Sequence, residues 1–378
     1  MCALLALAGC ATAPRGEAPP DVMIVPEENA LAVEPPITPL PQTTPAPPPT
    51  RVLTPSASPS HLKFLAGTWI PLEQWCRLNG FGPLHQTVAG TAVTFSFNAT
   101  NGSISIRIGS QLAFWNGIEF RLGFAPQTLN GQPMVHDLDL RKNFAPLLEG
   151  GTHLKPRPVL VIDPGHGGID NGTRNVVTGH YEKEFTLDWA LRLQSILVSN
   201  GWSVYLTRTN DINLPLPSRV AFAAQHNADL FLSLHFNSSF PDREQAGLET
   251  YCLTPAGMPS NLTRGYIDNL RIAFPNNNFD GENLQLAVQL HRALLAVNGH
   301  GDRGVRRARF LGVLQNQNRP AVLVEGAYLS NPREARLVAD PAHRQRLAEA
   351  LARALLEGAG SGLNVTTHAS AAPIHPAP

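Results

Sequence analysis

The sequence has few cysteines and no excess of either charge. Its 378 residues include four cysteines, none of them in a C-x-x-C pair, which argues against a disulfide-dense scaffold and a cysteine-ligated zinc site. A bound metal would therefore need histidine and carboxylate ligands. Lys and Arg number 29, as do Asp and Glu, so the formal net charge is zero. This balance gives no electrostatic signature of a nucleic-acid partner or of an anionic membrane surface.

The most informative stretch is Val159–Gly168, in which an apolar run stops at a histidine set among glycines. The run Val159–Asp163 has no polar alternation, which predicts a strand buried on both faces of a parallel sheet. Pro164 ends the ladder, and the glycines keep side-chain bulk away from His166. These glycines match neither G-x-G-x-x-G nor G-K-[ST]. The pattern leaves two interpretations: an imidazole presented to a ligand, or a turn histidine bonded to the backbone.

Two further apolar runs are followed by residues with metal-site chemistry. Leu230–Leu234 precedes His235, and Ala321–Val324 precedes Glu325. Helical patterns lie between these runs, including one that begins at about Glu182. From about residue 156 to 358 we therefore predict an α/β domain with one mostly parallel sheet flanked by helices.

Four side chains should converge at one edge of this sheet. His166, His235 and Glu325 each follow a predicted strand, and Glu182 lies at the amino end of the helix after the first strand. Two histidines and one carboxylate form the ligand set of an open catalytic zinc site, with a fourth position for water. A second carboxylate can act as general acid and base. Taken singly, Glu182 also has an interpretation as a helix-dipole partner and Glu325 as a strand-end cap.

Five motifs carry a resemblance to a known family. In consistent order over about residues 156–358, the chain resembles the zinc-dependent N-acetylmuramoyl-L-alanine amidases through Asp163–Gly168, Glu182-Lys183, Leu206–Arg208, Ala228–Asn237 and Pro320–Asn331. Small departures at Phe236 and Ala327-Tyr328 leave the ligand positions unchanged.

The resemblance implies a role for each converging residue. It implies that His166, Glu182 and His235 hold Zn²⁺, that Glu325 is the catalytic acid and base, and that the substrate is peptidoglycan. The bond cut would be the amide between N-acetylmuramic acid and L-alanine, in cell-wall remodelling and cell separation. Glu184 is the rival ligand, although the motif register favours Glu182. The family also implies control by a regulatory protein partner, for which the sequence carries no motif.

The amino-terminal part predicts export. Met1–Cys10 is apolar but too short to span a bilayer, and Leu7–Cys10 resembles the lipobox of bacterial lipoproteins. This resemblance implies a periplasmic protein anchored to a membrane through a lipidated Cys10. A basic segment before the apolar run is missing, which indicates either an upstream translation start or a signal that does not function. Residues 11–60 contain 14 of the 34 prolines and predict an extended linker.

Residues 61–150 predict a small α+β domain. Alternating segments flank Asn101-Gly102, which indicates a β-hairpin, and a second turn is centred on Asn116-Gly117. The segment resembles the copper-amine-oxidase N-terminal-like domain, and it contains no cluster of candidate ligands. We expect it to position the enzyme on the wall, so that truncation before Pro156 leaves hydrolysis of soluble muropeptides intact. Residues 359–378 predict a disordered tail.

Two other functions remain compatible with the sequence. One is a non-catalytic peptidoglycan-binding protein that keeps the amidase fold, although a binder needs no acid and base such as Glu325. The other is a zinc peptidase that cuts within the stem peptide. The sequence does not show whether the segment Pro241–Asp280, predicted as a variable insert, covers the site.

Overall fold

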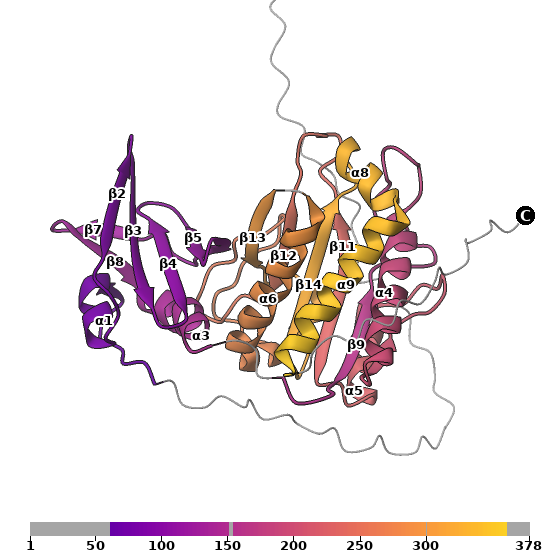
Figure 1. Cartoon of the computed structure of the whole chain (residues 1–378), viewed down its shortest axis with the longest axis horizontal. Coiled ribbons are helices and arrows are strands. Elements are labelled where there is room, and N and C mark those ends of the chain that lie inside the picture. The colour runs from indigo at the N-terminus through magenta and orange to yellow at the C-terminus, as the bar shows by residue number, and fades with distance from the viewer. Residues whose placement is uncertain (1–60, 151–153, 300, 361–378) are drawn as a thin grey trace, which may run out of the picture. The chain divides into compact units, whose positions relative to one another are not determined.

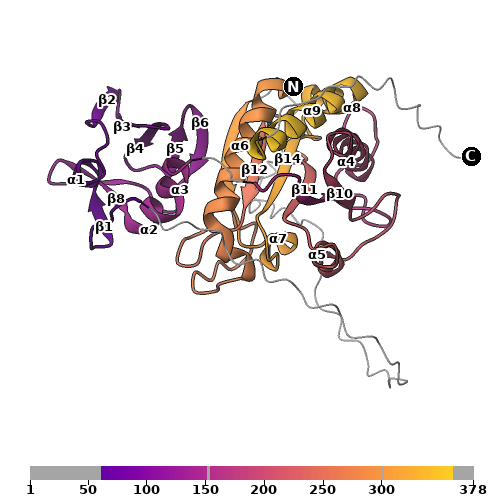
Figure 2. The same ribbon diagram turned by 60° about the horizontal axis from the view of Figure 1, so that its bottom comes forward.

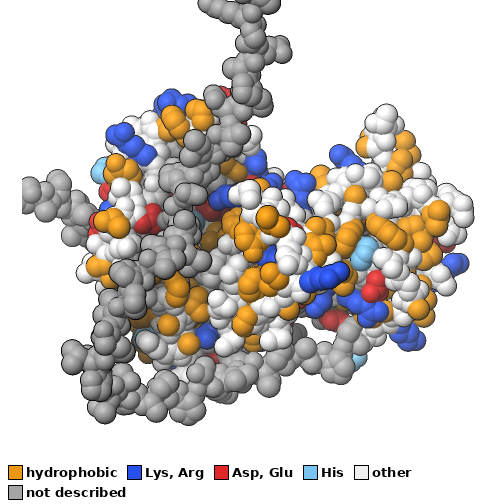
Figure 3. Space-filling model, turned by 180° about the vertical axis from the view of Figure 1, so that it is seen from behind, with side chains coloured by type: hydrophobic (Ala, Val, Ile, Leu, Met, Phe, Trp, Pro, Cys, Tyr) orange, Lys and Arg blue, Asp and Glu red, His pale blue; other side chains and the backbone are white. Residues whose placement is uncertain are grey.

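The computed structural model describes residues 61–150, 154–299 and 301–360. The lipobox-like Cys10, the proline-rich segment 11–60 and the tail beyond residue 360 lie outside the described residues. Among the residues that are described, no helix combines the length and apolarity needed to cross a bilayer. On the face seen in Figure 3, groups of hydrophobic side chains are interspersed with side chains of both charges. This mixture accords with a formal net charge of zero.

The amino-terminal elements are short strands and helices. In chain order they are β1 (Trp69–Pro71), α1 (Leu72–Leu78), β2 (His85–Ala89), β3 (Ala92–Ala99), β4 (Gly102–Arg107), β5 (Leu112–Trp115), β6 (Ile118–Arg121), β7 (Gln127–Leu129), β8 (Gln132–His136), α2 (Asp137–Asp139), the π-helix η1 (Leu140–Phe144) and α3 (Ala145–Leu148). Strands β3 and β4 pair antiparallel across Asn101-Gly102, and β5 pairs with β6 across Asn116-Gly117. Both predicted hairpins are confirmed.

The remaining elements alternate strand with helix. They are β9 (Val159–Pro164), α4 (Glu182–Ser199), β10 (Ser203–Leu206), α5 (Leu216–Gln225), β11 (Leu230–Asn237), β12 (Leu248–Cys252), the 3-10 helix η2 (Pro275–Phe279), α6 (Asp280–Asn298), β13 (Asp302–Arg307), α7 (Gly312–Gln315), β14 (Ala321–Tyr328), α8 (Pro332–Ala339) and α9 (Pro341–Gly358). Asn331 and Asp340 cap α8 and α9 through side-chain oxygens, and each helix has proline at its first position.

The sheet is mixed but mostly parallel in this part, as predicted. Strands β10, β9, β11 and β14 are parallel neighbours. Strand β12 pairs antiparallel with β14 and parallel with β13. The segment Pro241–Asp280, predicted as a variable insert, thus contributes a strand, β12, that the sequence did not indicate. All five side chains of β12 are buried, so no polar alternation separated it from the loop around it.

Helices cover both faces of the parallel strands. Along β9, Leu160 and Ile162 join the core under α4, α6 and α9, whereas Val161 joins a second core with residues of α5 and α7. Figure 2 shows these two groups of helices on opposite sides of the strands. Side chains that alternate between two apolar layers explain why the strands show continuous hydrophobicity in sequence.

The amino-terminal strands extend the same sheet. Val305 of β13 bridges to Phe120 of β6, and the ladder continues through β5, β4, β3 and β2 (Figure 1). A single apolar core includes side chains from both parts. Arg307, which is 2% exposed, donates to the Lys142 carbonyl (2.7 Å) and the Asn143 side-chain oxygen (3.2 Å). The boundary predicted near residue 150 is therefore crossed by strand pairing, apolar packing and hydrogen bonds.

Candidate metal centre

Three side chains meet at the edge of the parallel strands. One ligand atom each from His166, Glu182 and His235 lies within 4.8 Å of the other two. His166 Nε2 is 3.1 Å from Glu182 Oε2, and His235 Nδ1 is 3.0 Å from Glu182 Oε1. No other such group of histidine, cysteine or carboxylate side chains occurs among residues 61–150, 154–299 and 301–360. The structure thus brings together the three predicted ligands.

His166 is held by its loop in an unusual backbone conformation. Its φ is 61°, a left-handed geometry that side chains rarely adopt and that functional sites often retain. Arg219 Nη2 donates to its carbonyl (2.9 Å), and the ring Nδ1 lies 2.8 Å from Asp170 Oδ1. With Nδ1 engaged in this way, Nε2 faces Glu182. A buried ion pair between Arg219 and Asp163 at 2.9 Å anchors the loop to the strand before it.

Two glycines leave room for the ligand side chains. A Cβ atom at Gly165 would lie 2.2 Å from the His235 ring, and one at Gly172 would lie 2.6 Å from both Glu182 Oε2 and the His166 ring. Contacts this close do not occur between real atoms, so any larger residue would displace the rings. The glycine beside the His166 ring is thus Gly172, whereas the predicted Gly165 makes room for the His235 ring, and a Cβ at Gly167 or Gly168 would meet Ile212 or Asn213 instead.

Glu182, rather than Glu184, belongs to the group. Glu182 is the first residue of α4 and is buried, and its carboxylate accepts from the backbone nitrogens of Thr173 (3.0 Å) and Phe236 (2.9 Å). Glu184 instead lies 2.7 Å from His180 Nδ1 and accepts from the Tyr181 backbone nitrogen at 2.9 Å. Glu184 therefore serves as a helix cap, and Glu182, which the motif register favours, is the carboxylate that lies in the group.

Glu325 lies beside His235 on the neighbouring strand. The two residues are register partners of β14 and β11. Both strands continue past these residues, to Tyr328 and Asn237, so the prediction that the strands end at them was wrong. The pairing register of β11 with β14 shifts between His235 and Asn237. The apolar runs Leu230–Leu234 and Ala321–Val324 stop just before His235 and Glu325, where the site begins. Glu325 is 9% exposed, and its Oε2 has no hydrogen-bond partner among the described residues.

The electrostatics of the group favour a cation. Burial lowers the pKa of His166, but Glu182 and Asp170 raise it to about 11. Burial would raise the pKa of Glu182, yet His166 and His235 hold it well below its ordinary value. For Glu325, burial and then the Glu182 carboxylate raise the pKa to about 8. The surroundings thus lower the pKa of Glu182 and raise that of Glu325 at one buried site. Such a difference in pKa between two neighbouring carboxyl groups is found at catalytic sites.

The donor set fits a zinc ion. Ligands about 2.0–2.1 Å from a tetrahedral zinc lie roughly 3.3 Å from one another, and each histidine has a nitrogen at a similar distance from one Glu182 oxygen, His166 from Oε2 at 3.1 Å and His235 from Oε1 at 3.0 Å. Asp170 supplies the carboxylate that commonly orients a zinc-bound histidine through its other nitrogen. The sequence interpretation missed Asp170. Its signal was a carboxylate four residues after a candidate ligand, inside the same glycine-rich loop.

A second residue beside Glu325 was also missed. Arg264 lies close enough to lower the pKa of Glu325, against the raising effects of burial and of Glu182. Its Nη2 is 3.4 Å from the Asn237 side-chain oxygen, and its guanidinium lies over the Phe310 ring at 5.6 Å. Arg264 belongs to the long segment between β12 and α6, where no periodic pattern marked it.

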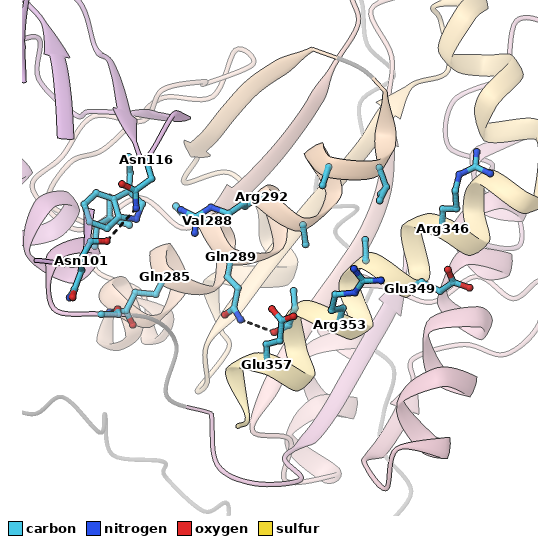
Figure 4. Close-up of a pocket in the computed structure, with 18 residues that line it drawn as sticks. Asn101, Asn116, Gln285, Val288, Gln289, Arg292, Arg346, Glu349, Arg353 and Glu357 are labelled. Atoms are coloured by element: carbon cyan, nitrogen blue, oxygen red, sulfur yellow. Dashed lines mark hydrogen bonds between the residues drawn. The ribbon is translucent and has the colours of Figure 1, made fainter. Parts of the chain in front are cut away.

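A hollow in the described part of the chain lies apart from the metal-group residues. A cavity of about 810 Å³ is bordered by α6, α9 and the turns beside Asn101 and Asn116. Figure 4 shows Gln289 of α6 joined to the backbone of α9, with Arg292 and Arg353 nearby. None of the metal-group residues lines this cavity. The candidate centre is thus defined by its donor atoms and not by cavity size.

Comparisons with known proteins identify the family of this chain. The family model described as N-acetylmuramoyl-L-alanine amidase matches residues 160–357. The chain is 31% identical over 269 residues to N-acetylmuramoyl-L-alanine amidase AmiA of Escherichia coli, covering 62% of this chain and 89% of AmiA. It is 35% identical over 195 residues to LytC of Bacillus subtilis, covering 51% of this chain and 34% of LytC. Against the catalytic domain of CwlV from Bacillus (Paenibacillus) polymyxa, the TM-score is 0.44 at 32% identity, covering 53% and 97%. The chain belongs to the N-acetylmuramoyl-L-alanine amidase family.

Proposed function

We propose that the protein is a zinc-dependent hydrolase of the amide between N-acetylmuramic acid and L-alanine in peptidoglycan. His166, Glu182 and His235 hold the zinc ion, and Glu325 is the catalytic acid and base. The observation that carries the proposal is the meeting of three ligand atoms within 4.8 Å, next to a buried carboxylate with an unpartnered oxygen. A binding protein would gain nothing from burying such a group at a cost of several kcal/mol.

The residues of the metal group and those around it have distinct parts in this reaction. A zinc ion held by His166, Glu182 and His235 would supply Lewis acidity to the scissile carbonyl and to the attacking water at neutral pH. Glu325 takes the proton that the attacking water loses and donates it to the nitrogen of the departing L-alanine. The burial that raises the pKa of Glu325 makes its protonated form a competent donor. Asp170 fixes the His166 ring, and the backbone donors of Thr173 and Phe236 fix Glu182.

Digestion of purified sacculi tests the proposal against its alternatives. An amidase releases complete stem peptides and leaves intact glycan strands. A peptidase acting within the stem gives shortened peptides, and a wall-binding protein leaves the material unchanged. Mass spectrometry of the soluble fraction separates the three results. Release of shortened peptides alone would contradict the proposal.

Export and lipidation belong to the same proposal. Cleavage before Cys10 and its acylation would attach the enzyme to a membrane that faces the wall, with residues 11–60 as spacer. One acyl chain holds a protein only marginally, so stable attachment requires the several chains of a bacterial lipoprotein. A fatty-acid probe should label the wild-type protein and not Cys10→Ser. Membrane partitioning of Cys10→Ser equal to that of wild type would contradict the anchor.

The amino-terminal region has a proposed role in positioning. Residues 61–150 contribute no member of the metal group, and their resemblance to the copper-amine-oxidase N-terminal-like domain stays a prediction. They would hold the enzyme on the wall. All five residues of β2 are exposed, so substitutions in this strand can test the positioning role. Substitutions there should weaken binding to sacculi and leave hydrolysis of soluble muropeptides unchanged. Unchanged binding to sacculi together with weaker hydrolysis of soluble muropeptides would contradict the role.

A further inference from the structure

A groove of about 620 Å³ lies beside the metal group. It is lined by the loop from Thr173 to Gly179 and by Phe240 and Arg243. The first loop joins β9 to α4, and the other two residues follow β11. These elements carry His166, Glu182 and His235, so the groove is built from the segments that position the ligands.

Thr173 joins the lining of the groove to the metal group, whose own residues do not line it. The Thr173 backbone nitrogen donates to Glu182 Oε2 at 3.0 Å, and the Thr173 carbonyl accepts from the Glu182 backbone nitrogen at 2.8 Å. A molecule bound against this loop therefore contacts the segment that hydrogen-bonds the Glu182 carboxylate. Further along, the Val176 backbone nitrogen donates to the Leu329 carbonyl at 3.1 Å, which ties the groove wall to the end of the strand bearing Glu325.

Two arginines of the groove have no acidic partner among the described residues. Arg174 donates through Nε to the Gly179 carbonyl at 3.1 Å, which fixes the guanidinium, and its terminal nitrogens have no protein acceptor among the described residues. For Arg243 only the backbone is engaged, because its carbonyl accepts from the Asn331 side chain at 3.0 Å. Both side chains are exposed. Arginine matches a carboxylate in charge and in planar donor geometry.

Apolar surface lies beside these charges. Phe240 is 58% exposed and Val177 is 43% exposed, and both line the groove. Large exposed hydrophobic side chains in a concave site next to a catalytic centre indicate contact with a ligand. The ligand predicted by this lining carries a carboxylate next to aliphatic groups, as an acidic peptide does.

We propose that this groove holds the stem peptide, with Arg174 and Arg243 binding the free α-carboxylate of its second residue. The inference rests on the proposed amidase function, which places the L-alanine at the start of the stem next to Glu325. The aliphatic part of the stem packs on Phe240 and Val177. The groove thereby makes the enzyme selective for stems whose second residue is D-glutamate over stems in which that carboxylate is amidated.

The test uses the full zinc-loaded chain and two soluble muramoyl tripeptides that differ only in this carboxylate or amide. We expect wild type to show a KM roughly tenfold or more lower for the acid, as for one charge-assisted bond. Arg174→Gln and Arg243→Gln should each remove most of this preference by raising the KM for the acid, with kcat changed by less than about threefold. Arg107→Gln, at an exposed position on β4, is the matched control and should keep the preference.

Failure of the groove and failure of the amidase function give different results. Equal KM values for the two muropeptides in wild type, or an unchanged preference in both arginine variants, overturns the groove assignment and leaves the amidase function standing. If neither muropeptide is cleaved, the amidase function fails. Calorimetric titration with the two free stem tripeptides then tests the groove assignment. Tighter binding of the acid by wild type, lost in the arginine variants, supports the assignment, and equal binding of the two tripeptides overturns it.

Discussion

Two parts of one sheet differ in how they use their strands. In β14 all eight residues are buried, and in β2 all five are exposed. The parallel part is covered by helices on both faces, and the antiparallel part ends in an open edge strand. Metal-group residues occur only in the first part among the described residues. A polar side chain at the edge of a doubly covered sheet is held by packing from both sides, and this is how three ligand atoms are positioned together.

Loss of a histidine ligand should have the largest effect. His166→Ala and His235→Ala each remove one of three ligands, so zinc content and amidase activity should fall together by orders of magnitude. His85→Ala, on the exposed strand β2, is the matched control and should keep both. Metal analysis by mass spectrometry and muropeptide assays provide the measurement. Normal zinc content in both ligand variants would contradict the claim that the metal site lies in the parallel part of the sheet.

A single methyl group should disturb the site through space alone. Gly165→Ala would place Cβ 2.2 Å from the His235 ring, and displacing a ligand ring should weaken zinc affinity by roughly 10- to 100-fold. At Gly82, in the antiparallel part, an added Cβ would have an ordinary contact at 3.5 Å. Competition with a zinc chelator measures both affinities. An affinity for Gly165→Ala equal to that of Gly82→Ala would show that the close approach is not required.

The junction of the two parts should contribute to stability rather than to chemistry. Arg307→Met leaves the Asn143 and Lys142 oxygens without their buried donor, and should lower the free energy of unfolding by about 2–4 kcal/mol. Chemical denaturation measures this, with Arg107→Met as control. Activity per folded molecule should be retained. A variant as stable as its control would mean that the two parts fold independently.

The same packing changes an expectation drawn from sequence. Truncation before Pro156 was expected to leave hydrolysis of soluble muropeptides intact. In the structure Phe120, Leu122 and Phe144 share a core with Leu284 and Val305, so truncation would expose that core to water at roughly 25 cal/mol per Å² of apolar surface. We expect the truncated protein to be markedly less stable. Full activity and unchanged stability of the truncated chain would contradict this packing argument.

An ion pair between two helices should give the smallest effect, with a defined pH dependence. Burial would raise the pKa of Asp188, but hydrogen bonds from Arg192 and Arg344 hold it below its ordinary value. The pair therefore stabilises the fold above the unfolded pKa of about 3.9, and this contribution is lost as pH falls through the lower folded value. Asp188→Asn should cost about 1–3 kcal/mol at pH 7 and progressively less below pH ~4.

Denaturation of Asp188→Asn at several pH values, with zinc held constant, measures this difference. Glu73→Gln, on an exposed position of α1, is the control and should follow the wild-type curve. A difference between wild type and Asp188→Asn that is constant from pH 7 to pH 3 would contradict the assigned pKa direction.

The sequence predicted the elements that carry a clear local pattern. The run at Val159, the helix start near Glu182 and the turn at Asn101-Gly102 each depend on neighbouring residues, and each was found. Convergence of His166, Glu182 and His235 was also predictable, because the carboxyl ends of parallel strands share an edge.

The rest depended on contacts between distant residues. Strand β12 is short and wholly buried, so its pattern resembles neither an alternating strand nor a loop. The junction of β6 with β13 joins residues 120 and 305, and no local pattern records such a pairing. Asp170 and Arg264 acquire their roles from the three-dimensional surroundings of His166 and Glu325, which spacing in the sequence does not specify.

The central claim is that three residues hold the metal while Glu325 moves the proton, and one measurement tests it directly. Zinc content and turnover of purified Glu325→Gln are determined on the same sample, beside wild type and His235→Ala. Glutamine keeps the size of the side chain but cannot accept a proton, so zinc should remain bound while turnover falls by roughly 10²–10⁴. A Glu325→Gln enzyme that loses its zinc as His235→Ala does, or that retains near-normal turnover, would contradict the account.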